Sequence, residues 1–165
     1  MKITDLSGKY IAKYLSEKEV PQILELCKGN PQYYEHCPPY ATEETIKKDM
    51  SALPPRKTMK DKHYFGFFDG EKLVAIVDLI ERFPNENTAF IGFFMMNKDY
   101  QGHGIGSEII SGMSKALSKD FTHIRLGYVE TNMQAKNFWL KNGFVYTGLK
   151  SKEDLYTVII MEKEL

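Results

Sequence analysis

Three glycines alternate with other residues within the stretch GFFMMNKDYQGHGIGSEII, residues 92–110. Gly102, Gly104 and Gly106 follow an apolar run and precede a pattern typical of an amphipathic helix. The first N–H groups of a helix have no intrahelical partner, and the helix dipole places partial positive charge at the same end. Because glycine lets the backbone approach a ligand closely, this pattern predicts a turn that binds phosphate or pyrophosphate.

Two common phosphate-binding loops do not fit this turn. No G-K-[ST] follows the glycines, and the dinucleotide pattern G-x-G-x-x-G fails because residue 107 is serine. Two alternatives therefore stay open beside the anion site. One is a tight strand-to-helix turn without a ligand, and the other is a regulatory domain that binds a nucleotide.

Composition narrows the class of protein. A chain of 165 residues suits one domain, 1–165, and a formal net charge of 0 disfavours nucleic-acid partners. Cys27 and Cys37 form no CxxC pair and the four histidines have no zinc spacing, so we expect a reducing compartment and no metal. The N-terminus lacks the apolar segment of a signal peptide, and no apolar run approaches about 18 residues. We therefore expect a cytoplasmic protein without a membrane partner.

The elements before the glycine turn follow from caps and periodicity. Residues 9–16 look like a strand, and a helix is expected from Ser16, with Glu19 completing a capping box, to Gly29. A second helix is expected after Thr42 and ends before the prolines at 54 and 55. Residues 29–44 read as the loop between these helices. Residues 63–68 and 72–80 read as a hairpin.

The second half of the chain alternates strands and helices. Residues 88–96 form a strand that is apolar on both faces and hence central, followed by a helix over 104–119 and a strand over 123–130. A short helix then ends at Asn142-Gly143, and two strands complete the chain. This order predicts an α/β fold with a mixed sheet and helices on its faces.

Two segments resemble the signatures of the GCN5-related N-acetyltransferases (GNAT). QGHGIG, residues 101–106, is similar to Q/R-x-x-G-x-G/A, and NMQAKNFWLKNGF, residues 132–144, is similar to N-x-x-A-x-x-(apolar)-Y-x-x-x-G-F. The second signature is matched by Asn132, Ala135, Phe138, Gly143 and Phe144. The resemblance spans essentially the whole chain. It implies an acyl-CoA N-acyltransferase fold, in which two central parallel strands of the mixed sheet splay apart.

The resemblance also implies acetyl-CoA as cosubstrate, without a metal. The pantetheine arm would lie between the splayed strands, the glycine turn would hold the pyrophosphate, and the helix after Asn132 would line the thiol end. The cofactor-binding residues that the resemblance implies are Phe94, Met95, Met96, Gln101, Gly102, His103, Gly104, Ile105, Gly106, Ser107, Asn132, Phe138 and Trp139. For His103, an exposed position in the turn is the competing interpretation.

The sequence departs from the family at Trp139. The family often has a tyrosine there that protonates the leaving thiolate, whereas indole N–H is a donor without useful acidity. The general-acid role therefore does not carry over. Trp139 could hydrogen-bond the sulfur or the carbonyl, or it could pack along the CoA arm.

Two carboxylates are candidates for the base. Asp78 interrupts an apolar strand, where a carboxylate is costly unless it is used or paired. It could deprotonate or bind a substrate ammonium, or it could mark a strand end or cap a backbone group. Glu130 ends the strand beside the cofactor strand, and a solvated loop carboxylate is the alternative there.

The acceptor would be held by the segment between the early helices. Tyr33, Tyr34 and Tyr40 could form an aromatic wall that receives an amine, or they could pack the loop down on itself. Glu81 follows Asp78 closely enough to line the same pocket. Tyr128 is a candidate on the splayed strand, although tyrosine is also a common strand residue.

Together these features favour an N-acetyltransferase that acts on an amino group of a small molecule or a peptide. The acetyl group would move by direct attack in a ternary complex. The alternative is a CoA-binding module with weak or no catalysis. The chain could be a monomer or a homodimer, since the last strand, within residues 155–164, could pair between subunits.

Overall fold

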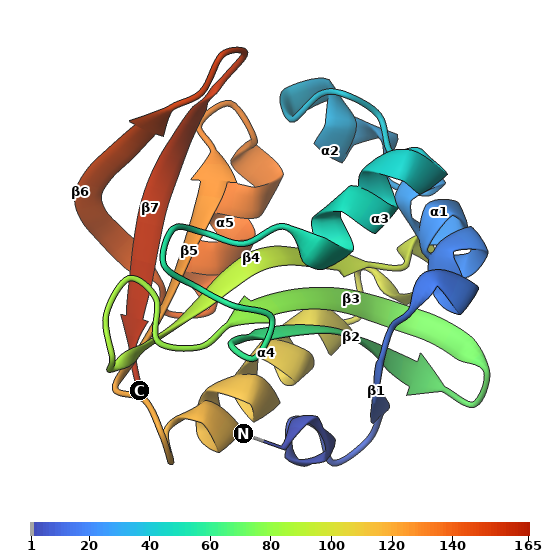
Figure 1. Cartoon of the computed structure of the whole chain (residues 1–165), viewed down its shortest axis with the longest axis horizontal. Helices are drawn as coiled ribbons and strands as arrows, with labels where there is room; N and C mark the ends of the chain where they lie inside the picture. The colour runs from blue at the N-terminus through green and yellow to red at the C-terminus, as the bar shows by residue number, and fades with distance from the viewer. Residues whose placement is uncertain (1) are drawn as a thin grey trace.

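The computed structural model describes residues 2–165, and a seven-stranded mixed sheet runs through it in the order β1-β2-β3-β4-β5-β7-β6 (Figure 1). The strands are β1 (Ile11–Tyr14), β2 (Lys62–Asp69), β3 (Lys72–Ile80), β4 (Thr88–Met96), β5 (His123–Val129), β6 (Val145–Lys152) and β7 (Thr157–Glu164). The helices are α1 (Val20–Lys28), α2 (Pro31–His36), α3 (Glu43–Ser51), α4 (Ile105–Leu117) and α5 (Met133–Lys141). The mixed α/β sheet predicted from the sequence is confirmed.

The helix ends follow the predicted caps. Ser16 and Glu19 form the capping box, although the first turn is a 3-10 turn and α1 begins only at Val20. The Thr42 side chain accepts from the N–H of Thr45 and starts α3. Gly143, with φ of 85°, follows the end of α5 in the left-handed region that glycine adopts without strain.

Two expectations were wrong. Residues 29–44 are not only a loop, because they contain α2, a six-residue helix with Pro31 at its start. Six residues are too few to show a helical period. The last strand is not free to pair with a second subunit, because β7 lies between β5 and β6 of the same chain. The physical basis for expecting a dimer through this strand is therefore absent.

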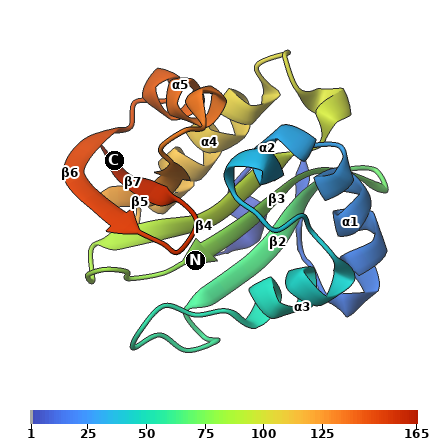
Figure 2. The ribbon, with the colours of Figure 1, turned by 90° about the horizontal axis from the view of Figure 1, so that it is seen from above.

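Two apolar layers cover the sheet. Figure 2 shows α4 and α5 on one side and α1 and α3 on the other. Alternate residues of β2 point to opposite layers: Phe65 packs in the core with Met113 of α4, whereas Tyr64 packs in the core with Ile23 of α1. This period-two alternation fixes which side chains reach each face.

The sheet opens between its two parallel strands. Thr88 to Ile91 of β4 pair with His123 to Leu126 of β5, and the pairing stops there. Farther along, β4 pairs only with β3 and β5 pairs only with β7. A bulge at residue 92 marks the point of divergence, because Asp78 pairs with Phe93 whereas Leu79 pairs with Ile91.

Among residues 2–165, no helix is both long and apolar enough to cross a membrane.

Candidate functional site

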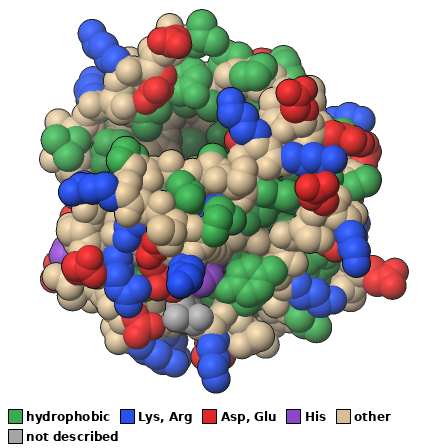
Figure 3. All heavy atoms as spheres, viewed as in Figure 1, with side chains coloured by type: hydrophobic (Ala, Val, Ile, Leu, Met, Phe, Trp, Pro, Cys, Tyr) green, Lys and Arg blue, Asp and Glu red, His purple; other side chains and the backbone are tan. Residues whose placement is uncertain are grey.

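A cavity of about 550 Å³ lies where β4 and β5 diverge. Its walls come from the second half of β4, the end of β5, the first turn of α4, one face of α5 and residues of α2. Figure 3 shows a hollow in this face, in the upper part of the view, with hydrophobic side chains around it. The volume lies in the range typical of small-molecule and cofactor sites.

The glycine turn forms one end of the cavity. Gly102 and Gly104 have φ of 80° and 77°, and a Cβ on either would meet nothing within 4 Å. The Glu108 N–H donates to the Gly104 carbonyl at 3.0 Å, which leaves the N–H groups of residues 105–107 without intrahelical partners. Open space beside free N–H groups at a helix start fits a phosphate group.

Gly106 has a different role from the other two glycines. A Cβ there would lie 3.1 Å from Cε2 of Phe138, so this glycine allows α4 and α5 to pack closely. The backbone of Gly106 lines the cavity, and its predicted part in binding pyrophosphate stays a prediction.

The Gln101 side chain points into the protein and holds the glycine turn in place through hydrogen bonds. Its Nε2 donates to Asn30 Oδ1 at 2.7 Å and to the Met96 carbonyl at 3.1 Å, and Asn30 Nδ2 donates to the same carbonyl at 3.0 Å. Asn30 lines the cavity, and no motif in the sequence indicated it. His103 is exposed and does not line the cavity, which matches the competing interpretation.

Trp139 is packed within an aromatic group. It is only 7% exposed, and its ring centroid lies 5.8 Å from Phe94, 4.9 Å from Phe138 and 5.1 Å from Phe144. The Phe94 and Phe138 rings stack in turn. All but Phe144 line the cavity, so this group forms the wall on the α5 side.

Asn132 begins this wall by capping α5. Its Oδ1 accepts the N–H of Ala135 at 3.0 Å, and its side chain is buried. The spacing of asparagine and alanine in the second signature thus has a local physical cause, since a side-chain oxygen at the N-cap satisfies an otherwise free N–H.

Aromatic and thiol groups form the other end of the cavity. Tyr33 of α2 lies edge to face against Phe93 at 5.7 Å, and Cys37 and Tyr156 lie beside it in the lining. Burial, followed by the neighbouring Cys37, raises the pKa of Tyr33 well above its usual range. A hydrogen bond with Cys37, followed by burial, raises the pKa of Tyr156 to about 12. Cys37 and Tyr156 carried no sequence signal.

Of the other tyrosines predicted to bind the acceptor, one lines the cavity and two do not. Tyr34 is buried behind Tyr33, with ring centroids 5.0 Å apart, and Tyr40 is exposed, and neither lines the cavity. Tyr128 does line it, but its hydroxyl lies 2.9 Å from that of Tyr146. Burial, followed by this hydrogen bond, raises the pKa of Tyr128.

Asp78 lies behind the cavity wall rather than in it. Its Oδ2 accepts from Lys62 Nζ at 2.7 Å, and the Lys62 side chain is only 1% exposed. A Cβ on Gly92, which lines the cavity, would lie 3.0 Å from the same carboxylate oxygen. Burial raises the pKa of Asp78, and the Lys62 ammonium opposes this shift.

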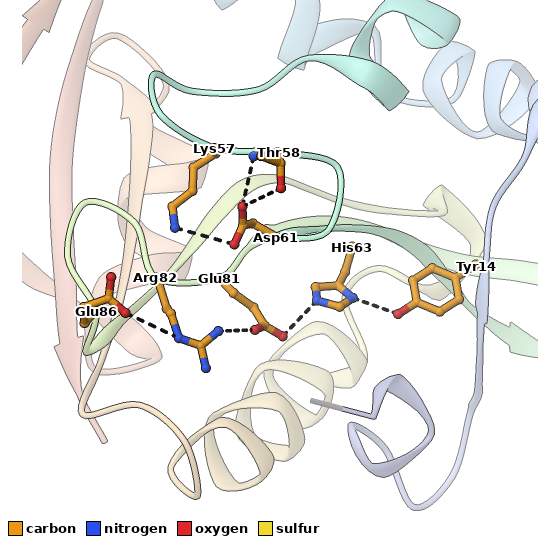
Figure 4. A network of polar contacts seen from close by, with 8 residues as sticks. All are labelled: Tyr14, Lys57, Thr58, Asp61, His63, Glu81, Arg82 and Glu86. Carbon is orange, nitrogen blue, oxygen red and sulfur yellow. Dashed lines mark hydrogen bonds and ion pairs between the residues drawn. The ribbon is translucent and has the colours of Figure 1, made fainter.

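The other two predicted carboxylates lie outside the cavity. Glu130 is exposed and pairs with Lys150 at 2.7 Å, as its alternative interpretation expected. Glu81 belongs to a separate network, in which it contacts His63 at 2.9 Å and Arg82 at 2.9 Å, and His63 in turn contacts Tyr14 (Figure 4). Glu81 directly follows the last residue of β3 and contacts His63, whereas Asp78 within β3 contacts Lys62, which sequence proximity does not reveal.

The part of the chain that the structure describes holds no group of three or more histidine, cysteine or acidic side chains placed to bind a metal ion.

Comparison with known proteins identifies the family. A model described as the acetyltransferase (GNAT) family matches residues 23–144. The fold is similar to that of an acetyltransferase from Thermus thermophilus, with a TM-score of 0.77 and 20% identity over 95% of this chain and 97% of that one. It is also similar to the PaiA N-acetyltransferase from Thermoplasma acidophilum in complex with coenzyme A, with a TM-score of 0.67 and 18% identity over 94% and 99% of the chains. A third similar structure is a spermidine N-acetyltransferase SpeG chimera from Vibrio cholerae and hSSAT, with a TM-score of 0.71 and 18% identity over 95% and 96%. At these identities the structural likeness shows the fold, and the family match over most of the chain shows that the protein belongs to the GNAT acetyltransferases.

Proposed function

We propose that this chain transfers the acetyl group of acetyl-CoA to an amino group, by direct attack of the amine in a ternary complex. The observation that carries the proposal is a single cavity that joins the glycine turn to the aromatic end beside Tyr33. One end is suited to pyrophosphate and the other to an acceptor. The coenzyme A in the similar PaiA structure supports the choice of donor.

The residues present fit coenzyme A. The free N–H groups at the start of α4 would hold the pyrophosphate. Because β4 loses its β5 partner after Ile91, backbone groups of Phe94 and Met95 could pair with the amide-rich arm as with an added strand. The aromatic wall of Phe94, Phe138 and Trp139 would cover the arm and exclude water. When bound, acetyl-CoA supplies an activated thioester.

Binding can be tested by thermal unfolding with acetyl-CoA, using NAD and ATP as controls. A ligand at about 100 times its dissociation constant stabilises the folded state by about 2.7 kcal/mol, which shifts the melting temperature measurably. We expect a shift with acetyl-CoA alone. A shift with NAD or ATP and none with acetyl-CoA would favour the nucleotide-binding alternative.

One observation favours the second candidate, a CoA-binding module without catalysis. Trp139 is packed between aromatic rings at the position where the family signature has a tyrosine. CoA thiolate is nevertheless a fair leaving group, so we expect slow but measurable release of free thiol with a suitable amine. Acetyl-CoA binding without thiol release across a broad amine panel would support the module instead.

A further inference from the structure

The bulge at Gly92 leaves a gap in the cavity wall. Gly92 is the extra residue between the two registers of β3 and β4, it is exposed, and it lines the cavity. It has no side chain, and the position that a Cβ would take lies 3.0 Å from Asp78 Oδ2. The carboxylate of Asp78 is therefore the group directly behind this gap.

Asp78 has one oxygen in use and one without a partner. Oδ2 accepts from Lys62 Nζ, which also donates to the Ala52 carbonyl at 2.9 Å. Oδ1 is buried and has no hydrogen-bond partner among residues 2–165. A buried carboxylate oxygen without a donor is costly, so a further positive charge close to this carboxylate would be favourable.

The charges around Asp78 suit a cationic donor. After the larger effect of burial, Asp49 of α3 also raises the pKa of Asp78. Burial raises the pKa of Asp49 in turn, against the opposing effect of Lys62 and then of Lys48. Two carboxylates thus interact electrostatically with one buried ammonium.

Helix α2 closes over this end. His36 Nδ1 lies 2.9 Å from Thr131 Oγ1 in the loop before α5, and Cys37, next after α2, lines the cavity together with Tyr156, which directly precedes β7. These contacts tie α2 to both segments on the far side of the opening between β4 and β5. An extended polypeptide would have to displace α2 to cross this opening, whereas a small molecule would fit beneath it.

We propose that the acceptor is a small primary amine rather than a polypeptide, and that Asp78 receives its ammonium across Gly92. This proposal rests on the proposed acetyl transfer and names its substrate class. The rings of Tyr33 and Phe93 beside the gap would favour a cation carried on a short apolar or aromatic stem.

The step balances with the groups named. The ammonium gives one proton to Asp78 Oδ2, the carboxylate oxygen nearest Gly92, and the neutral nitrogen attacks the thioester carbonyl carbon. A C–N bond forms and the C–S bond breaks, with its electron pair leaving on sulfur. The second proton lost by nitrogen ends on that sulfur as the CoA thiol. A desolvated carboxylate with a raised pKa suits a general base.

Two variants separate this role from a structural one. Asp78→Asn removes the charge, but it leaves Lys62 buried without its counterion and could fail to fold. Gly92→Ala keeps both charges and adds one Cβ, which fills the gap and would lie 3.0 Å from Asp78 Oδ2, at a position with an ordinary φ. Gly29→Ala is the matched control, because Gly29 also has an ordinary φ, a Cβ there would lie 3.2 Å from Lys98 Cδ, and Gly29 lies outside the cavity lining.

Calorimetry of the dead-end complex with CoA gives a readout besides activity. The probes are 2-phenylethylamine, 1,4-diaminobutane and a ten-residue peptide with a free N-terminus and one lysine. We expect at least one small amine to bind and the peptide not to. In Gly92→Ala, and in Asp78→Asn if it folds, amine affinity should fall about tenfold or more while CoA affinity changes less than about twofold.

Each other outcome counts against the proposal. Unchanged amine affinity in Gly92→Ala would remove Asp78 from the acceptor site. Binding and acetylation of the peptide, without those of the amines, would show a polypeptide acceptor and leave acetyl transfer intact. Absence of CoA binding in the wild-type chain would overturn the proposed function itself, and this inference with it.

Discussion

At the scale of single residues, the Lys62–Asp78 pair is the strongest electrostatic feature near the cavity. Lys62 is almost fully enclosed and Asp78 is 15% exposed, so each charge depends on the other for compensation. A buried pair of this kind contributes little net stability compared with apolar residues, but removal of one partner leaves an uncompensated charge. Its position beside a cavity favours a functional use of Asp78.

Lys62→Met should therefore destabilise the protein by about 3–5 kcal/mol at pH 7. Without the ammonium, the pKa of Asp78 in the folded state rises further above its unfolded value. A raised folded pKa means that stability is greatest at low pH and is lost as the pH rises through that pKa, so the deficit should shrink as the pH falls. Urea unfolding at several pH values measures this.

The control is Lys72→Met, which removes an exposed pair with Asp99 in which both side chains are 53% exposed. It should cost no more than about 1 kcal/mol. Equal losses in the free energy of unfolding of the two variants would show that burial does not make the Lys62–Asp78 pair more important than an exposed pair.

At the scale of elements, the junction between β4 and α4 positions the glycine turn at the end of the cavity. The Met96 carbonyl at the end of β4 accepts from both Asn30 and Gln101, so the end of α1 and the glycine turn are held to the same strand. The turn then places Gly102 and Gly104, both with positive φ, beside open space at the start of α4. Rigid attachment of a loop at both ends keeps its N–H groups directed at a ligand.

Gly104→Val should abolish acetyl-CoA binding while the fold survives, because a branched side chain would fill the space beside the free N–H groups. Gly148→Val is the matched control: Gly148 of β6 has φ of 84° and equally open space but lies outside the cavity lining. Both substitutions carry the same backbone strain, of order 1–2 kcal/mol. Calorimetry with acetyl-CoA should separate them, and equal affinities would contradict the assignment of the turn.

At the scale of the whole molecule, a single sheet runs through the protein and contributes strands to both ends of the cavity. Its strands run from β1 at one edge to β6 at the other, and the cavity opens within it rather than between separate bodies. We propose on this basis that residues 1–165 form a single GNAT domain. Since both the donor end and the acceptor end depend on this sheet, loss of either half should abolish the site.

A single domain should unfold in one cooperative transition. Trp139, the sole tryptophan of the chain, reports on α5 through fluorescence, whereas far-UV circular dichroism reports on all helices and strands. We expect the two urea unfolding curves to coincide. Separate midpoints for the two signals would indicate independently unfolding parts.

The sequence by itself determined the elements, because caps, turn glycines and apolar periodicity are local. Ser16, Thr42 and the glycine at 143 mark their helix ends for reasons that need only neighbouring residues. The glycine turn and the helix after Asn132 likewise point to the family through short contiguous segments. Helix α2 could not be predicted from the sequence, because six residues are too few to show a helical period.

Only the tertiary structure decided which side chains share a wall. Asp78 and Glu81 are three residues apart, yet Asp78 pairs with Lys62 and Glu81 pairs with His63, and these consecutive residues of β2 point to opposite faces of the sheet. Cys37 and Tyr156 meet across 119 positions of sequence because α2 spans the opening in the sheet. Such contacts depend on register, on the bulge at Gly92 and on the divergence of β4 from β5, none of which has a local sequence signal.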